Sequence, residues 1–582
     1  MDAVSFQLPI EYINNKTKID NHICSDLELY KTTAGTEPDN SNNLQEETIP
    51  IYNSVFLPSS NFSKKTIPLW SRYFTSDVSF LIDTQNLLKK KHGDVQATDY
   101  TGIENIWSEI TTETGFHDKY QYIDWPLFKW VNYNIPVLQL VSMYNLVSPL
   151  LSLALPIFFI IIPFFLLKIK GISITFEKYK EVLVHIISKH QLGQLMNFSS
   201  VSWDKRIYII ITVGFYVLQT YQNALSCIRF YKHSKKIHGQ LFEVRKYLQH
   251  TLDNMQEFEN NSREMKTYQP FCDTMRKHKQ SLIDYHTELI YISPYALSFK
   301  KFLDLGRIMR CFYKLYNDIP LHTSLSYSFG FNGYIENITG MQHNISTKKM
   351  TACTFTKNKT KFSKAYYPPL ITSTVRNTYD INKHILLTGP NASGKTTLLK
   401  TTICNLILSQ QCGIGFYAKA KIAPVDKIHC YINIPDTSSR DSLFQAEARR
   451  CKDVLDSIKT GDANHKHFCI FDELYSGTNP YEAIGGAVSF LRFLNTNKNI
   501  RFLITTHYLD MCKRLHADKD IYNCHMETKP IDNKEGKETF DYLYKLKGGI
   551  SSIKGGVKVL QDLDYPDDII VGAKKIIHSL DM

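Results

Sequence analysis

The chain has 582 residues, a net charge of +12, 43% hydrophobic residues and 21% charged residues. This length and apolar content allow three or four folded domains and exclude a chain that is disordered throughout. Twelve cysteines occur without a Cys-x-x-Cys pair, which argues against a structural zinc site and a secreted disulfide framework. The positive charge permits a polyanionic partner, either nucleic acid or anionic lipid, without choosing between them.

The N-terminal part is polar and gives no strong periodic signal. Residues 1–65 are rich in Asn, Thr, Ser and Lys, and they predict a largely disordered tail with at most short ordered pieces. We expect a small N-terminal region over residues 66–130.

An apolar stretch follows. Residues 130–167 contain no charged side chain, and residues 146–167 are long enough for one membrane span of about 20 residues. Transmembrane helices tolerate prolines such as Pro149, Pro156 and Pro163, although a buried helix of a soluble core is the alternative. Residues 207–228 are also charge-free, but their second half is polar. We therefore expect a membrane-spanning region over 131–228, with one or two transmembrane helices.

Flanking charges suggest an orientation for these spans. Five acidic residues precede the first span and four lysines follow it, which favours the C-terminal side facing the cytosol. Two topologies fit: a single span, or a hairpin whose 168–206 loop lies outside.

Residues 229–364 mix charged and apolar positions in a helical pattern and predict long helices. Within them, residues 276–279 read Arg-Lys-His-Lys, a cluster that suits DNA phosphates or anionic lipid. A solvated helix face is the commoner role of such a cluster.

A glycine-rich phosphate loop lies between an apolar run and a helical pattern. The loop consists of Gly389, Pro390, Asn391, Ala392, Ser393, Gly394, Lys395 and Thr396, and the helix continues with Thr397. In such loops backbone N–H groups face the phosphates, the lysine reaches the outer phosphates and the threonine hydroxyl ligates magnesium. The pattern predicts binding of ATP with Mg²⁺, although this short motif also arises by chance.

Two further predicted strands end in polar residues. Residues 468–471 lead to Asp472 and Glu473, and residues 502–505 lead to Thr506 and His507. We expect Asp472 to join Thr396 at magnesium and Glu473 to orient or deprotonate the attacking water. His507 can contact the γ-phosphate, so we expect Glu473, His507 and Lys395 to act in catalysis, although a lone histidine is more often a packed polar residue.

The order of these motifs resembles the ATPase domain of the MutS family. The resemblance rests on the segments Thr388-Gly389-Pro390-Asn391, Gln411-Cys412-Gly413, Ser442-Leu443-Phe444-Gln445-Ala446-Glu447, Asp472-Glu473-Leu474 with Gly477-Thr478, Thr506-His507-Tyr508, and Tyr542 to Leu546 with Ser551 to Val557. It also includes Tyr367-Pro368-Pro369-Leu370 and Asn377, which stand where the family has a His-Pro turn and an Asn-Asp pair. The match covers residues 365–582, with weaker likeness in the helical region before it.

This resemblance implies an α/β P-loop ATPase domain of the ABC/MutS type at the C-terminus, preceded by an all-α lever-like region with the candidate transmembrane helices. It implies that Ser442 meets the γ-phosphate bound by a second subunit in a homodimer, that Tyr544 stacks on adenine, and that DNA is a partner. The sequence departs from the family where Gly-Arg-Gly-Thr-Ser is replaced by Tyr475 to Asn479, so the arginine is absent. Leu443 replaces the threonine of the signature, while Ser442 is retained.

These features predict a MutS-like ATPase that couples ATP to DNA binding in repair or recombination. It would be membrane-associated with its ATPase domain in the cytosol, and otherwise cytoplasmic or nuclear. The alternatives are a membrane-anchored ABC-type ATPase and a nucleotide-switched scaffold, neither acting on DNA. Phe116 is the nearest match to a mismatch-reading phenylalanine, but too little chain surrounds it for such a domain, so we expect a packed aromatic ring.

Overall fold

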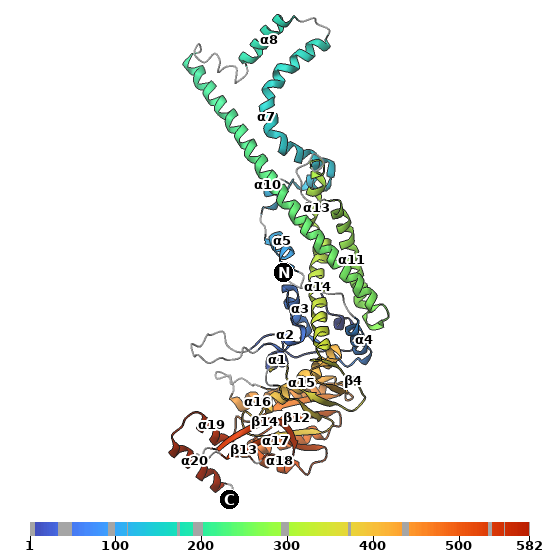
Figure 1. Cartoon of the computed structure of the whole chain (residues 1–582), viewed down its shortest axis with the longest axis vertical. Coiled ribbons are helices and arrows are strands. Elements are labelled where there is room, and N and C mark those ends of the chain that lie inside the picture. The colour runs from blue at the N-terminus through green and yellow to red at the C-terminus, as the bar shows by residue number, and fades with distance from the viewer. Residues whose placement is uncertain are drawn as a thin grey trace. The chain divides into compact units, whose positions relative to one another are not determined.

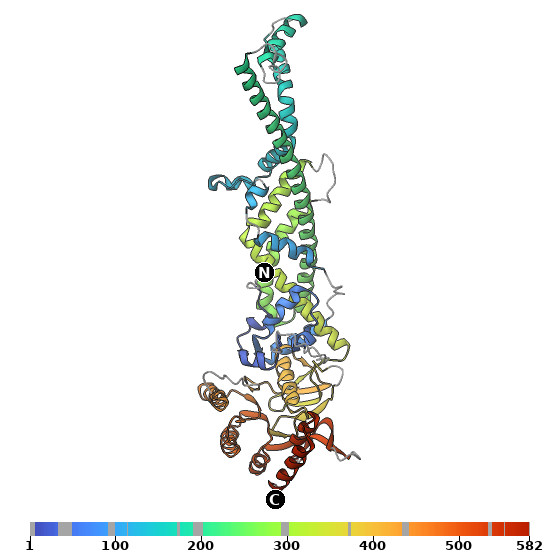
Figure 2. The same ribbon diagram turned by 90° about the vertical axis from the view of Figure 1, so that its left-hand side faces the viewer.

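The computed structural model describes residues 6–32, 49–90, 99–112, 115–120, 122–170, 175–189, 202–292, 302–370, 374–432, 442–532, 538–551, 553 and 555–580. The chain divides into two compact units (Figures 1 and 2). The first contains Asp99–Asp253 and Lys277–Ser326, and the second contains the remaining segments before, between and after these two.

The first unit is helical. Its elements are α5 (Thr101–Thr112), α6 (Phe116–Tyr120), η2 (Pro126–Tyr133), α7 (Ile135–Ile169), α8 (Phe176–Lys189) and α13 (Leu305–Asn317), with parts of α10 (Trp203–Ser262), α11 (Gln269–Ile290) and α14 (Ile319–Ser346). Helix α7 continues through all three of its internal prolines, although each lacks the N–H that an α-helical hydrogen bond needs.

The apolar stretch is not the buried core of this unit. Among the described residues, the segment Ile135–Ala154 is long and apolar enough to cross a membrane by length and composition, and only 17% of its most apolar window is buried. It overlaps the predicted span 146–167 in part. Such a helix alone is weak evidence for a membrane, because core helices of soluble proteins satisfy the same criterion.

Phe116 packs in the first unit, as expected for an aromatic core residue. It is 7% exposed, its ring stacks on Tyr316 at 3.8 Å between centroids, and it also stacks on Tyr122 at 5.1 Å. A ring held on two sides in this way is unavailable for insertion between bases.

The second unit combines helices with four sheets. Its helices are η1 (Pro9–Tyr12), α1 (Asn21–Asp26), α2 (Ile51–Phe56), α3 (Asn61–Trp70), α4 (Val78–Lys89), η4 (Lys266–Tyr268), α15 (Lys395–Cys412), α16 (Leu443–Thr460), α17 (Pro480–Asn495), α18 (Leu509–Leu515), α19 (Gly556–Asp562) and α20 (Asp567–Leu580). Its strands are β1 (Lys16–Lys18), β2 (Tyr73–Thr75), β3 (Thr351–Ala352), β4 (Thr354–Phe355), β5 (Lys361–Ala365), β6 (Asn377–Asp380), β7 (His384–Thr388), β8 (Ile414–Gly415), β9 (Lys419–Ile422), β10 (Lys427–Tyr431), β11 (His467–Asp472), β12 (Ile500–Thr505), β13 (Ile521–Asp532) and β14 (Glu538–Gly548).

A six-stranded sheet organises the C-terminal part of this unit. Its strand order is β10-β11-β12-β7-β13-β14, and all neighbouring pairs are parallel except β13 with β14. Strand β7 is buried at every position, and helices α15 and α17 both contact the sheet. Strands of a parallel sheet that is covered by helices are apolar along their whole length, which explains uninterrupted apolar runs such as residues 468–471. Because these strands are parallel, the carboxyl ends of β7, β11 and β12 meet at one edge of the sheet. Figure 1 shows β12 in this part of the chain, with α15 and α17 nearby.

The N-terminal 65 residues correct our expectation of a largely disordered tail. Residues 6–32 and 49–65 are described, and they include the fully or almost fully buried side chains of Phe6, Leu8, Leu27 and Phe56. Strand β1 pairs antiparallel with β2. Composition misled here because the apolar residues are sparse in sequence, while some of them, such as Phe6 and Phe56, pack against α14, which is more than 250 residues away in the chain.

Helix α14 shows how closely these segments pack. A Cβ atom at Gly330, Gly333 or Gly340 would lie within about 2.5 Å of atoms in Phe6, Phe62 or Phe56 respectively. These glycines let the helix backbone approach the N-terminal segments, so the segments belong to the core of the second unit.

We predict that Gly340→Ala destabilises the second unit, because the new methyl group would lie 1.9 Å from the Phe56 carbonyl oxygen. The expected cost is about 1–3 kcal/mol, as for other overpacked sites. Gly239→Ala is the control, since Gly239 also lies in a helix but has open space around it. Thermal and urea unfolding midpoints should fall for the first variant and stay or rise slightly for the second. Equal midpoints would contradict the packing argument.

Candidate functional site

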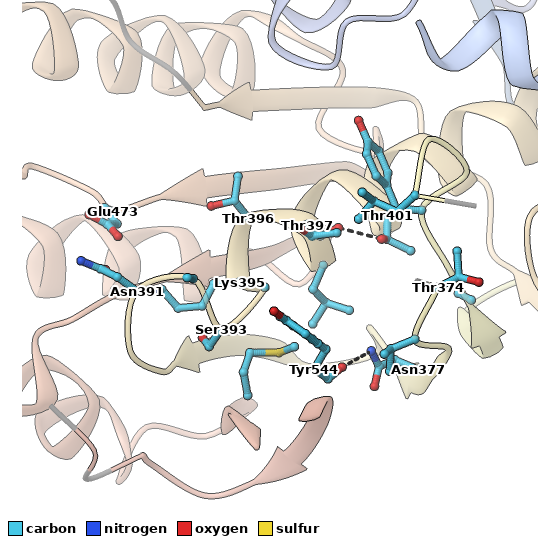
Figure 3. A pocket seen from close by; sticks show the side chains of 18 residues that line it. Thr374, Asn377, Asn391, Ser393, Lys395, Thr396, Thr397, Thr401, Glu473 and Tyr544 are labelled. Atoms are coloured by element: carbon cyan, nitrogen blue, oxygen red, sulfur yellow. Dashed lines mark hydrogen bonds between the residues drawn. The ribbon is translucent and has the colours of Figure 1, made fainter. Parts of the chain in front are cut away.

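The phosphate loop lies at the mouth of a pocket of about 620 Å³ in the second unit (Figure 3). The pocket is lined by residues 391–398 of the loop and helix α15, together with Ala365, Tyr367, Leu370, Thr374, Val375, Asn377, Thr401, Glu473, Met526 and Tyr544. This volume is within the range of small-molecule sites. Figure 3 shows Glu473 at one end of the pocket, with Thr374 and Asn377 at the other.

The loop backbone is shaped to face a ligand. Gly394 has φ +90°, and a Cβ there would lie 3.0 Å from the Tyr544 ring, so a larger residue would be strained in conformation and crowded. Gly394 is also the N-cap of α15. The first N–H groups of that helix have no partner within the helix, and with the helix dipole they favour an anion at this position.

Thr396 and Asp472 are brought together as predicted. The Thr396 hydroxyl donates to Asp472 Oδ2 at 2.8 Å, and the hydroxyl of Thr505 donates to Asp472 Oδ1. Hydroxyl and carboxylate oxygens are the ligands that Mg²⁺ prefers. Thr505 was not predicted, because a threonine at the end of an apolar strand carries no distinctive signal.

Lys395, His507 and Glu473 form a second cluster. The Lys395 ammonium contacts the carbonyl oxygens of Gly389 and Pro390 at 3.1 and 3.2 Å, and it lies 3.1 Å from His507 Nε2. The same Nε2 atom lies 2.8 Å from Glu473 Oε1. One nitrogen cannot accept a proton from the lysine and donate one to the glutamate together. Which neighbour Nε2 bonds therefore depends on whether that nitrogen carries a hydrogen atom.

The charges of this cluster depend on one another. The hydrogen bond from His507 lowers the pKa of Glu473, burial opposes that shift, and the charges of His507 and Lys395 lower it further. Burial lowers the pKa of Lys395, while Glu473 and Asp472 oppose that shift. Glu473 is therefore held as a carboxylate, the form that can accept a proton from water.

Ser442 lies apart from the pocket. It is exposed and caps helix α16, accepting from the N–H of Gln445, whose side chain accepts from the Ser442 N–H in return. Its position outside this chain's own pocket is compatible with the role across a subunit interface that the sequence suggested.

Glu447 joins α16 to the loop that follows Glu473. Its carboxylate is 2% exposed and accepts from the N–H and hydroxyl of Ser476 and from the N–H of Gly477. A Cβ at Gly477 would lie 2.8 Å from the side chain of Leu443, so this loop packs tightly on the start of α16. We call these three hydrogen bonds between Glu447 and the loop the Glu447 clasp. The sequence showed Glu447 within the signature but did not indicate these bonds.

The far end of the pocket is formed around Asn377 and Tyr544. The Asn377 amide donates to the Tyr544 carbonyl at 2.9 Å and its oxygen accepts from the Leu546 N–H (Figure 3). Tyr544 is 41% exposed and lines the pocket beside Gly394. Thr374, Val375 and Met526 were missed as lining residues, because they come from two distant segments and none belongs to a motif.

The donor set fits a nucleoside triphosphate with Mg²⁺. The Ser393 hydroxyl is buried in the loop and has no hydrogen-bond partner among the described residues, so a phosphate oxygen would satisfy it. Lys395 supplies a cation, and Thr396 with Asp472 supplies oxygen ligands. Among the described residues there is no cluster of three or more His, Cys, Asp or Glu side chains that suits a metal such as zinc.

The phosphate loop before a helix and the carboxylates at the end of another parallel strand of the same sheet are the arrangement of a nucleotide-binding α/β domain. Residues 385–581 match the family model "MutS domain V". The predicted resemblance to the MutS family is thereby confirmed over the C-terminal third of the chain.

Individual relatives agree with this family. The chain is 30% identical over 200 residues to the DNA mismatch repair protein MutS of Phocaeicola vulgatus, covering 34% of this chain and 22% of that protein. It is 30% identical over 212 residues to human MutS protein homolog 4, covering 35% of this chain and 22% of that protein. The chain spans about a fifth of the length of the curated relatives it matches.

Two substitutions should separate nucleotide binding from turnover. We predict that Lys395→Ala weakens ATP binding, because the outer phosphates lose their fixed cation, whereas Glu473→Gln keeps binding and slows hydrolysis by roughly two or more orders of magnitude. Binding is measured by titration of a fluorescent nucleotide, and turnover by phosphate release. Unchanged turnover in Glu473→Gln would remove that residue from its assigned role.

Proposed function

We propose that this protein binds and hydrolyses ATP in the pocket beside the phosphate loop and couples ATP to DNA binding. The observation that carries the proposal is the hydrogen bond from Thr396 to Asp472, next to the cluster of Lys395, His507 and Glu473. These side chains come from three separate strand ends and converge at one edge of the sheet. Such convergence is the arrangement that phosphoryl transfer requires, since catalysis there is mostly positioning and electrostatics.

Each residue has a role in this proposal. Lys395 neutralises the outer phosphates, and Glu473 accepts a proton from the attacking water. His507 contacts the γ-phosphate, while Tyr544 stacks on the base. When bound, Mg²⁺ at Thr396 and Asp472 would neutralise charge that develops on the phosphate oxygens.

The ATP site is proposed to be composite and to be completed by a second copy of the chain. The support is that Ser442 caps α16 outside this chain's own pocket, and that the clasp by Glu447 fixes the neighbouring loop to the same helix. A helix N-terminus presented at the surface suits a γ-phosphate held by a partner.

We predict that ATP promotes dimerisation and that Glu473→Gln traps the dimer. Lys395→Ala and Ser442→Ala should each be nearly inactive alone. An equal mixture should recover roughly a quarter of wild-type turnover, because half of the dimers then hold one intact site. Light scattering and phosphate release measure the two effects. A monomer under saturating ATP in Glu473→Gln, or no recovery on mixing, would contradict the composite site.

DNA is proposed as the partner by similarity to relatives named for mismatch repair. Because Phe116, the nearest match to a mismatch-reading phenylalanine ahead of the apolar span, is packed between rings, the proposed DNA contacts are to phosphates rather than to a mismatch. The net charge of +12 supports contacts of that kind.

We predict that DNA affinity falls steeply with salt and differs by less than about tenfold, ~1.4 kcal/mol, between homoduplex and a single mismatch. Fluorescence anisotropy at several fixed salt concentrations tests both parts. A larger preference for the mismatch would contradict this prediction and would mean that another segment of the chain recognises mismatched bases.

A membrane-anchored ABC-type ATPase or a nucleotide-switched scaffold is the alternative, and the unburied apolar segment Ile135–Ala154 is the observation that favours it. DNA-stimulated ATP hydrolysis separates the two proposals, since only the first expects stimulation. In either case the ATPase domain is proposed to face the cytosol, where ATP is available.

A further inference from the structure

Helices α7 and α10 run in opposite directions in the first unit, meet around Ser152, and diverge beyond that level toward α8 (Figures 1 and 2). The Tyr216 hydroxyl donates to the Ser152 carbonyl oxygen at 3.0 Å, and the Asn223 amide donates to the Ser152 hydroxyl at 3.3 Å. Further along, the Cys227 thiol contacts the Leu146 carbonyl oxygen at 3.3 Å. Residue numbers therefore rise along one helix as they fall along the other.

The outer faces of this helix pair are apolar and exposed. In α7 the exposed side chains include Phe158, Ile161, Ile162, Phe164, Phe165 and Leu166, and in α10 they include Ile207, Ile210, Ile211, Phe215, Val217 and Leu218. The polar groups of Ser152, Tyr216 and Asn223 are instead bonded between the helices. This pattern is the reverse of a soluble helix pair, in which apolar side chains pack inside and polar ones face water.

The exposed apolar side chains are not confined to one side of the helix. Phe164, Phe165 and Leu166 are consecutive and all exposed, and successive side chains of a helix point about 100° apart. A second copy of the chain would cover one side of the pair, whereas lipid covers all sides.

The length of the apolar part suits a bilayer. From Ser152 to Ile169, α7 rises roughly 27 Å, close to the ~30 Å thickness of a hydrocarbon core. At one end Trp203 is 74% exposed, with the Arg206 guanidinium 5.2 Å from its ring centre. At the other end Gln219 and Gln222 are exposed near the level of Ser152. Tryptophan and polar side chains are typical of membrane interfaces.

We propose that α7 and α10 insert into a lipid bilayer as a two-pass hairpin. The antiparallel contacts favour the hairpin over the single span, so the chain before α7 and the chain after α10 lie on the same side of the membrane. Helix α8 then lies on the opposite side. The proposal is independent of ATP hydrolysis and of DNA binding, since it rests on residues of the first unit alone.

Topology can be tested with single added cysteines at three exposed positions of the full chain: Asp124→Cys before α7, Lys178→Cys in α8, and Lys246→Cys after the apolar part of α10. Sealed membrane vesicles from expressing cells are treated with a membrane-impermeant maleimide before and after permeabilisation. Peptide mapping by mass spectrometry counts each site separately from the native cysteines.

The hairpin requires the sites at 124 and 246 to react alike and the site at 178 to react oppositely. If the cysteine at 124 reacts differently from those at 178 and 246, α7 alone crosses the membrane, and the hairpin is overturned in favour of a single span. If all three react equally before permeabilisation, the pair does not cross a membrane, and the proposal is overturned.

A matched pair of substitutions tests the lipid contact. Ile210 and Val184 are equally exposed, 57% each, but Ile210 lies in the hairpin between Trp203 and Tyr216, and Val184 lies in α8. An arginine in hydrocarbon is costly, so Ile210→Arg should reduce the carbonate-resistant membrane fraction by about tenfold or more, while Val184→Arg should leave it unchanged. The proposal is overturned if wild-type protein stays in the supernatant after alkaline carbonate as an oligomer that Ile210→Arg dissociates, because the apolar face then belongs to a contact with a second copy. Nucleotide binding by each variant checks that the ATPase domain remains folded.

Discussion

The hydrogen bond between Thr396 and Asp472 joins the two halves of the candidate site. Thr396 comes from the start of α15 and Asp472 from the end of β11, and they meet only because β12 and β7 continue the same parallel sheet. Every other feature of the site is fixed relative to this contact. Thr505, one strand further, bonds the same carboxylate, and Glu473 is the next residue along the chain.

His507 is the most informative side chain of the second cluster, because one of its nitrogens faces two groups of opposite charge. With a hydrogen atom on Nε2 the ring donates to Glu473, and without one Nε2 accepts from Lys395. A phosphate that draws the Lys395 ammonium away would favour the first state. The bond between His507 and Glu473 would then strengthen as the phosphates bind, which links occupancy of the pocket to the group that is proposed to accept a proton from water.

The sequence predicted the parts of the structure that depend on local pattern. The loop, helix α15 and the strands ending at Asp472 and Thr505 are short segments whose residue types follow from buried strands and tight turns. The N-terminal 65 residues were mispredicted, because sparse apolar residues such as Phe6 reveal a core only when α14 is beside them. Thr505 and the clasp at Glu447 were missed for a related reason. Thr505 and Glu447 each bond a segment that is distant in the sequence, and neither a threonine nor a glutamate is unusual by itself.

The loop after Glu473 differs from the MutS family at a position whose side chain determines the contacts of the loop. Ser476 stands where the MutS family has an arginine, and its hydroxyl and N–H both bond Glu447. A serine closes inward on a buried carboxylate, whereas an arginine would extend a cation from the same position. Tyr475, which has φ +61°, packs its ring 5.6 Å from that of Phe444 and so adds an apolar contact to the same helix. In the proposed dimer this loop would therefore act on the second subunit through the position of α16 and not through a charge of its own. Ser442 then becomes the group through which occupancy of one site would be sensed by the other.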